Sequence, residues 1–137
     1  MTNYADAALR HWNDGKHLED IKRSDNADQL YGFAAECAIK SAIVSVASPK
    51  DSTDVPKGYY LHIDGLWDKA PVQQFSRNFP GLALLLRQSN PFGNWTVDQR
   101  YHQSGYVTDE QLEVHRGITQ RLLSAVQVLG TRRGSRE

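Results

Sequence analysis

The sequence predicts an all-α fold: an antiparallel bundle of four or five helices with one long connector before the last helix. Long segments at both ends of the chain repeat apolar residues at helical spacing, and stretches rich in Pro, Gly and polar residues separate shorter segments between them. The chain has 137 residues, which suits a single domain with one hydrophobic core.

The first part of the chain predicts two long helices, over residues 4–22 and 27–46. The first has apolar residues at rough helical spacing, and Gly15 in its middle indicates either close packing against a neighbour or a bend. Residues 24–26 supply capping residues for the second helix. The second helix has a nearly continuous face of apolar and small residues, so we expect it at the centre of the bundle. This face comprises Leu30, Phe33, Ala34, Cys37, Ala38, Ser41 and Ala42.

Shorter elements are predicted in the middle of the chain. Residues 47–58 are a loop by composition, with prolines, serines and alternating charges. We predict a third helix over residues 64–79 and a short apolar helix over residues 82–88. Residues 95–107 mix aromatic residues, Arg and Gly, and we expect them to form an irregular, packed connector.

The last helix is predicted to begin at Thr108, because Thr108 and Gln111 have the spacing of a capping box. We expect Gly130 to end it. Its apolar stripe comprises Leu112, His115, Ile118, Leu122, Ala125, Val126 and Leu129. Residues 1–130 therefore form one helical domain, and residues 131–137, which are basic and lack an apolar anchor, are predicted to be a disordered tail.

Composition excludes several classes of protein. The chain carries 16 Lys and Arg against 16 Asp and Glu, and zero net charge argues against a general nucleic-acid coat. The single cysteine, Cys37, excludes an internal disulfide framework and a cysteine-rich zinc site, so we expect a cytoplasmic protein. No apolar run approaches the roughly 20 residues of a membrane span, and the N-terminus lacks the pattern of a signal peptide.

Neither a metal nor a cofactor is expected. His11 and Asp14 share one face of the first helix, but His17 lies six residues from His11 and points elsewhere. No Gly-rich phosphate loop and no cluster of Cys and His is present in the sequence.

Charge is distributed unevenly along the chain. Residues 1–70 hold 8 cations and 11 anions, whereas residues 71–137 hold 8 cations and 5 anions. All six Lys lie in the first half, so every cation of the second half is Arg, whose planar fork of donors matches phosphate oxygens. Either composition drifts along a short chain, or the C-terminal half builds an Arg-lined anion site.

The best candidate for such a site lies in the connector, where Arg100, Tyr101, His102 and Tyr106 follow Trp95. Arg and His can bind phosphate, and Tyr and Trp can stack on a base or a sugar. Loops are also where binding groups are often found. In the alternative interpretation, Arg100 caps a helix end or pairs with a core carboxylate while the aromatic residues pack in the core.

Three residues outside the connector complete the candidates. Glu36 lies on a mostly apolar helix and needs a partner if buried, so we interpret it as part of a structural ion pair, with Arg100 as a candidate partner. His115 and Arg116 on the last helix join the candidate RNA- or nucleotide-binding residues. The alternative for His115 is a hydrogen-bonded histidine in the core or at a dimer interface.

Two segments resemble the first two helices of the HEPN superfamily, the higher-eukaryote and prokaryote nucleotide-binding domains: RHWNDGKHL at residues 10–18 and NADQLYGFAAECAIK at residues 26–40. Trp95 followed by Arg100 and Tyr101 is similar to the segment before the last helix of such proteins. The resemblance implies an antiparallel bundle, a homodimer and work on RNA or nucleotides. It also implies a nucleotidyltransferase or an antitoxin as partner, as in prokaryotic toxin–antitoxin systems.

Ribonuclease members of that superfamily carry an Arg followed about four to six residues later by a His, in a cleft between two subunits. Here Arg100 is followed by His102, two positions on, while Arg10 and His17 lie in the first helix. This departure favours a non-catalytic module that binds RNA, a nucleotide or a partner protein. The alternative is a metal-independent endoribonuclease in which Arg100 binds the scissile phosphate and His102 transfers protons. A third hypothesis is an interaction protein without a nucleic-acid role.

Overall fold

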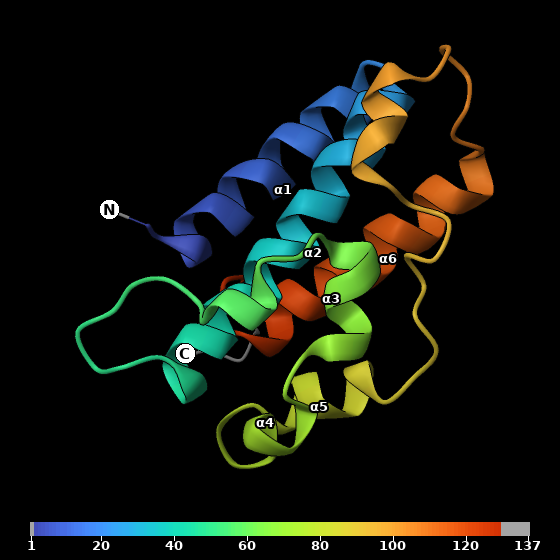
Figure 1. Cartoon of the computed structure of the whole chain (residues 1–137). Helices are drawn as coiled ribbons and strands as arrows, with labels where there is room; N and C mark the ends of the chain where they lie inside the picture. Colours follow the sequence, from blue (N-terminus) through green and yellow to red (C-terminus); the bar gives the residue numbers. More distant parts are fainter. Residues whose placement is uncertain (1, 130–137) are drawn as a thin grey trace, which may run out of the picture.

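The computed structural model describes residues 2–129, so Met1, Gly130 and the predicted tail lie outside the described residues. All regular structure in residues 2–129 is helical, which confirms the predicted all-α bundle (Figure 1). In chain order the elements are α1 (Tyr4–Asp20), α2 (Ser24–Ala47), the 3-10 helix η1 (Lys57–Tyr59), α3 (Ile63–Lys69), α4 (Val72–Asn78), α5 (Pro80–Leu86), the 3-10 helix η2 (Val97–Tyr101) and α6 (Asp109–Ala125).

α1 and α2 form an antiparallel hairpin with a turn of only three residues, 21–23, between them (Figure 1). Asn3 caps α1, because its side chain accepts a hydrogen bond from the backbone N–H of Asp6 at 3.0 Å. Gly15 of α1 lies against Tyr31 of α2, where an added Cβ would lie 2.8 Å from Tyr31 Cε1. Of the two interpretations of Gly15, close packing against a neighbour is therefore the correct one.

α2 is the central helix, as predicted. It packs against α1 on one side and against α6 on the other, and the small side chains of Ala34, Ala35 and Ala38 are fully buried in these contacts. By length and composition alone, α2 is also long and apolar enough to cross a membrane, contrary to the expectation that no segment approaches such a length. Most of it is buried inside the bundle, as a core helix requires.

The predicted third helix over residues 64–79 is wrong, because the structure divides this segment into α3 and α4. Ala70, the residue before Pro71, has an extended backbone with ψ of 145°, as the steric clash with a proline ring requires. α5 begins earlier than predicted, at Pro80, since proline is favoured in the first turn of a helix. The described residues thus contain six α-helices rather than four or five.

Trp95 anchors the connector after α5 and is only 1% exposed. Its ring covers Gly32 of α2 so closely that a Cβ added to Gly32 would lie 2.1 Å from Trp95 Cε2. Its Nε1 donates a hydrogen bond to the backbone carbonyl of Asp28 at 3.1 Å, and its ring meets Phe33 edge-on. Trp95 therefore fixes the backbone from which η2 starts two residues later.

α6 begins with the predicted capping box. The Thr108 hydroxyl accepts a hydrogen bond from the backbone N–H of Gln111, and the Gln111 side chain accepts one from the backbone N–H of Thr108. The helix ends at Ala125, so Val126 and Leu129 of the predicted stripe follow its last turn. Its buried residues are Leu112, His115, Ile118, Thr119, Leu122 and Leu123.

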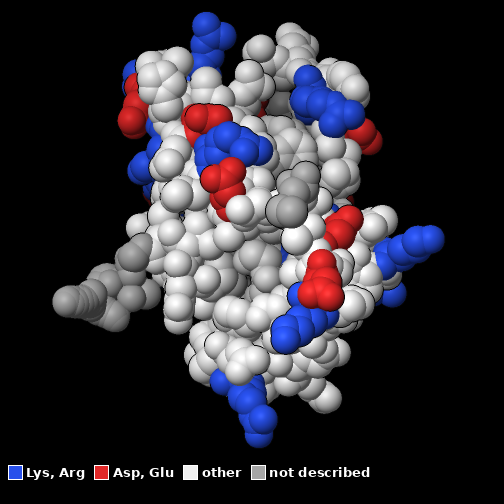
Figure 2. All heavy atoms as spheres, turned by 90° about the vertical axis from the view of Figure 1, so that its left-hand side faces the viewer, with Lys and Arg blue, Asp and Glu red and all other residues white. Residues whose placement is uncertain are grey.

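Charged residues of both signs are mixed on the surface. The face shown in Figure 2 carries cations and anions side by side around a large uncharged area, without a continuous basic patch. This pattern agrees with the zero net charge of the chain. Any anion site on this protein must therefore depend on local geometry rather than on a strong overall field.

Asp54 holds the loop between α2 and α3 against the start of α1. The hydroxyl groups of Tyr4 and Tyr60 both donate to its carboxylate, and the backbone N–H of Val55 donates to its Oδ1 at 2.7 Å. These hydrogen bonds, that of Tyr4 first, hold the pKa of Asp54 below its ordinary value. Burial and the bond to Asp54 in turn raise the pKa of the Tyr4 hydroxyl.

We expect this attachment to weaken in acid. Because the pKa of Asp54 is lower in the folded chain than in the unfolded chain, its stabilising contribution is complete above the unfolded pKa and is lost as pH falls through the folded pKa. Asp54→Asn should lower the free energy of unfolding at neutral pH, and its difference from wild type should shrink below about pH 4. Urea unfolding at several pH values measures both effects.

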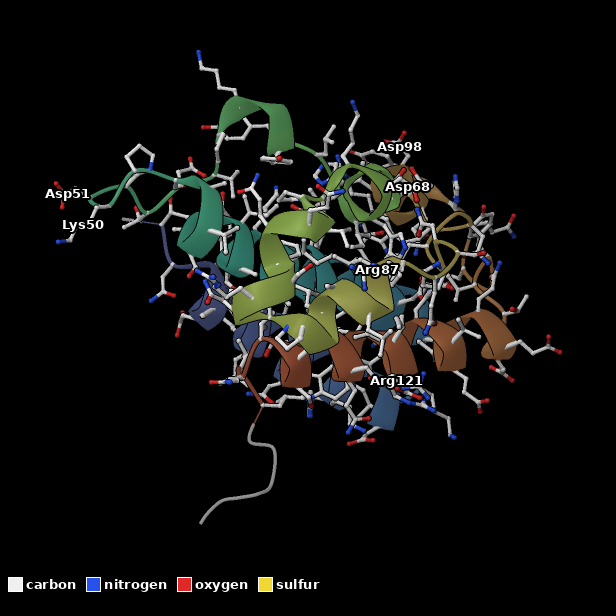
Figure 3. The ribbon with its side chains drawn as sticks, turned by 90° about the horizontal axis from the view of Figure 1, so that it is seen from below. Lys50, Asp51, Asp68, Arg87, Asp98 and Arg121 are labelled. Carbon is white, nitrogen blue, oxygen red and sulfur yellow. The ribbon has the colours of Figure 1, made fainter. Side chains whose placement is uncertain are left out.

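Asp51→Asn is the matched control, because Asp51 is an exposed carboxylate in the same loop (Figure 3). It should leave the free energy of unfolding unchanged. A stability difference between Asp54→Asn and wild type that stays constant from neutral pH into acid would contradict the assigned role of the carboxylate.

Candidate nucleic-acid interface

η2 and the following loop, residues 102–107, lie at the end of the bundle that carries the α1–α2 turn (Figure 1). Gln99 of η2 donates from Nε2 to Asp28 Oδ2 at 2.8 Å. Asp25, in the first turn of α2, accepts hydrogen bonds from the backbone N–H groups of Gly105 at 2.7 Å and Val107 at 3.0 Å. Two acidic residues of α2 therefore hold this segment, one at each end.

The exposed side chains between these anchors include Arg100, Tyr101, His102 and Tyr106, together called the Arg100 surface. The guanidinium carbon of Arg100 lies 4.7 Å from the centroid of the Tyr101 ring, which is a cation–π contact, and Tyr101 is 76% exposed. The ring centroids of His102 and Tyr106 lie 4.1 Å apart. The structure thus arranges four of the predicted site residues as two contacting pairs exposed to solvent, a cation–π pair and a pair of tilted rings.

The guanidinium of Arg100 has no acidic partner among residues 2–129. Among residues 2–129 the ion pairs involve other side chains, and none of them includes Arg100. Within the described residues, the imidazoles that form hydrogen bonds are those of His62 and His115, so the ring of His102 contacts Tyr106 without a hydrogen bond from this part of the chain that would orient it. The alternative in which Arg100 pairs with a core carboxylate is therefore wrong.

A hollow of about 400 Å³ lies next to the loop that carries Tyr106, where the α1–α2 turn faces residues 104–107. The exposed Lys22 and Arg23 line it and supply two further cations at this end of the bundle. Asp25 and Asp109 also line it, so its charge is mixed. No sequence pattern marks these lining residues, because the fold alone brings the two loops together.

His115, a candidate binding residue from the sequence, is 1% exposed and belongs to a buried network. Its Nδ1 lies 2.7 Å from Asp28 Oδ1, and its Nε2 lies 2.8 Å from Asn94 Oδ1 and 3.1 Å from the Pro91 carbonyl oxygen. Its ring also stacks on Phe92. Because both ring nitrogens are occupied inside the core, His115 is a structural histidine, which corrects its assignment to the binding residues.

The assignment of Trp95 and Arg116 to the binding residues is also wrong, because both side chains are engaged within the fold. Trp95 is enclosed in the core, where it cannot stack on a base. Arg116 forms a close ion pair with Glu19, which also accepts a hydrogen bond from the Tyr31 hydroxyl at 2.6 Å. Arg116 therefore ties α6 to the end of α1 instead of offering its guanidinium to a ligand.

Glu36 does form a structural ion pair, but its partner is Lys40 and not Arg100. Lys40 Nζ lies 2.9 Å from Glu36 Oε2, and both residues are buried. His62 Nδ1 lies 3.0 Å from Glu36 Oε1. Lys40 follows Glu36 by four residues on the same helix, so its spacing made this partner predictable from the sequence. His62 is distant in sequence and approaches Glu36 only in the folded chain.

The other groups considered, a thiol, a histidine and possible metal ligands, do not form a second candidate site among the described residues. Burial raises the pKa of the Cys37 thiol to about 12, so Cys37 is a weak nucleophile at neutral pH. Burial, with the neighbouring Arg10, lowers the pKa of His11. Within the part of the chain that the structure describes, no three His, Cys, Asp or Glu side chains are placed to hold a metal ion.

Comparison with family models, curated proteins and solved structures gives no match to this chain. The resemblance to the HEPN superfamily therefore stays a prediction from the sequence. What the Arg100 surface can bind is inferred from its own geometry and chemistry.

The position of the Arg100 surface is predicted to depend on Asp28. Asp28→Ala leaves His115 and Gln99 without their buried hydrogen-bond partner, and removing one member of a buried network of this kind costs about 3–5 kcal/mol. We expect urea unfolding to show a loss of that size. Asp98→Ala, which removes an exposed carboxylate of η2, is the control and should change stability by less than about 0.5 kcal/mol. Equal effects of the two substitutions would contradict the role of Asp28.

Proposed function

We propose that this chain is a non-catalytic module that binds single-stranded RNA or a nucleotide on the Arg100 surface. The observation that supports this most is the Arg100–Tyr101 pair, which is exposed to solvent and has no acidic partner among the described residues. A guanidinium offers several donors in one plane to a phosphate, and an aromatic face stacks on a base. The pair therefore presents both kinds of contact in adjacent residues.

The arrangement favours unpaired bases over a duplex. Bases of an RNA helix are stacked on each other and are not accessible to aromatic side chains, whereas bases of single strands can be splayed out onto them. Tyr101 and Tyr106 are exposed by 76% and 48%, so each can offer a ring face. The second pair, His102 on Tyr106, adds a polar edge beside a ring.

Binding should depend only moderately on salt, because few cations lie at this end of the bundle. Arg100, Lys22 and Arg23 are exposed there. If all three neutralise phosphates, the logarithm of the association constant falls with the logarithm of salt concentration with a slope of about −2. A general nucleic-acid coat with many contacts would give a much steeper slope.

Fluorescence anisotropy with a labelled single-stranded RNA tests the proposal. Arg100→Gln should weaken binding by removing the phosphate contact, and Tyr101→Ala and Tyr106→Ala should each weaken it by about 5- to 150-fold, since a base–aromatic stack contributes about 1–3 kcal/mol. Arg87→Gln is the control, because Arg87 is an exposed Arg at the end of α5 (Figure 3). Equal affinities of Arg100→Gln, Arg87→Gln and wild type would contradict the proposal.

A metal-independent endoribonuclease is the second candidate, because Arg100 and His102 are both exposed on the same 3-10 turn and its C-cap. Against it, no other residue between 2 and 129 forms a hydrogen bond with His102 that would orient its ring for proton transfer. Incubation with RNA in EDTA separates the two: the binding module leaves RNA intact. Cleavage that is lost in both Arg100→Ala and His102→Ala would establish the enzyme instead.

The proposed partner protein, a nucleotidyltransferase or an antitoxin, follows from the sequence resemblance alone. The proposed homodimer likewise follows from the sequence resemblance alone. A reading frame for such a partner beside the gene for this chain would support membership of a toxin–antitoxin or nucleotidyltransferase-linked system.

A further inference from the structure

His62 and Glu36 form a hydrogen-bonded pair away from the Arg100 surface, where the loop before α3 meets α2. His62 Nδ1 lies 3.0 Å from Glu36 Oε1. The Glu36 side chain is 11% exposed, whereas 48% of the His62 side chain is exposed. One edge of the imidazole therefore meets a buried carboxylate, and the rest of the ring is in contact with solvent.

The contacts of Glu36 determine which nitrogen of His62 is free. Lys40 Nζ lies 2.9 Å from Glu36 Oε2 and forms an ion pair with it, so the carboxylate is ionised. An ionised carboxylate only accepts hydrogen bonds, so Nδ1 of His62 is the donor, and Nε2 of the neutral ring carries the lone pair. Among residues 2–129 no hydrogen bond occupies Nε2. The pair thus presents a nucleophilic nitrogen in a fixed tautomer.

The position of the imidazole is fixed from two further directions. The backbone carbonyl of His62 accepts hydrogen bonds from the N–H groups of Gly65 at 3.1 Å and Leu66 at 2.8 Å, which begin α3. The ring centroid lies 6.0 Å from that of Phe33, with the two planes tilted by 59°. The ring is therefore held by its backbone, by Glu36 and by an aromatic neighbour.

The pair does not create a strong local charge that would repel an anionic reagent. Lys40 balances the charge of Glu36, so the carboxylate orients the imidazole without making the site acidic. The exposed charged residues nearest to His62 in sequence, Lys57 and Asp64, are also of opposite sign. An anion can therefore approach Nε2 against little net repulsion.

The surroundings of His62 are those of an acceptor and not of an enclosed active site. The hollows of about 320–400 Å³ in the surface of residues 2–129 are lined by other side chains. A substrate would find little to hold it beside His62, whereas an exposed nucleophile can take a group that another molecule delivers. A nucleophile of this kind is the central part of a modification site.

We propose that His62 is a modification site that accepts a phosphoryl group on Nε2 from a donor with a reactive phosphorus–nitrogen or acyl-phosphate bond. The Nε2 lone pair forms the new bond to phosphorus, while the bond from phosphorus to the leaving group breaks. Its electron pair leaves with that group, which takes a proton from solvent. The proton on Nδ1 stays in its hydrogen bond, and the Glu36 carboxylate compensates the positive charge that the ring acquires.

Reaction with potassium phosphoramidate tests the proposal, with phosphorylated peptides kept alkaline and quantified by mass spectrometry. His17 and His102 are internal controls, because both are exposed and neither bonds to a carboxylate within the described residues. His62 should react faster than either by about tenfold or more, since a hydrogen bond to a charged group stabilises the charged product. Phosphorus NMR should place the group on Nε2. Equal rates at the three histidines, or a product on Nδ1, would overturn the proposal.

The double variant Glu36→Gln/Lys40→Met tests the role of the carboxylate. It removes both charges of the buried pair together, so no unpaired charge stays in the core. The rate at His62 should fall to that at His17, while the rate at His17 is unchanged. An unaltered rate at His62 in a variant with the helical circular dichroism of wild type would contradict the assigned role of Glu36. The comparison of the three wild-type histidines stands without this variant.

Phosphorylation of His62 is separable from RNA binding. His62 is not part of the Arg100 surface, so Arg100→Gln should leave the rate at His62 unchanged. Failure of either proposal therefore leaves the other standing.

Discussion

The carboxylate of Asp28 lies in the core, 1% exposed, and the position of the whole connector depends on it. A charge buried among apolar side chains is stable only when its oxygens are hydrogen-bonded. Asp28 meets this requirement with one bond to His115 of α6 and one to Gln99 of η2, while its backbone carbonyl accepts from the Trp95 indole. A single residue of α2 thus links the central helix to three segments that are distant in sequence.

This network explains how an irregular connector can hold an exposed surface in a defined place. Binding groups on loops are effective when a rigid scaffold positions the loop. Gln99 and Trp95 fix one side of the segment, and Asp25 fixes the other by accepting from two backbone N–H groups. The side chains of Arg100, Tyr101, His102 and Tyr106 between these points are exposed to solvent. The buried residues therefore position Arg100, and Arg100 itself is available for binding.

The long helices were predictable because each has a strong local signal. Residues 4–22 and 27–46 correspond closely to α1 and α2, and the capping box at Thr108 marks the start of α6. The break before Pro71 was also predictable, since a proline disfavours a helical conformation in the residue before it. The predicted helix over residues 64–79 did not take this break into account. The short helices α3, α4 and α5 have too few turns for periodicity to separate them.

The candidate site was predictable only in part, because the sequence does not reveal which face of a segment is covered. Arg100 and Arg116 are the same residue type, yet one is exposed on η2 and the other is paired with Glu19 on a different helix. Trp95 and Tyr101 are both aromatic, yet Trp95 is in the core, where it covers Gly32 and its indole donates to the Asp28 carbonyl, whereas Tyr101 is exposed. No sequence pattern indicated the role of Asp28, because both residues that contact its carboxylate are more than 70 residues away.

The stacking of Arg100 on Tyr101 has a consequence for the entropy of recognition. A free Arg side chain samples many rotamers, and fixing them on binding costs about 0.5–1.5 kcal/mol for a side chain of this kind. A guanidinium already held against a ring has lost part of that freedom before any ligand arrives. The unbound protein therefore holds these donors close to the Tyr101 ring, and less of the binding free energy is consumed in ordering them.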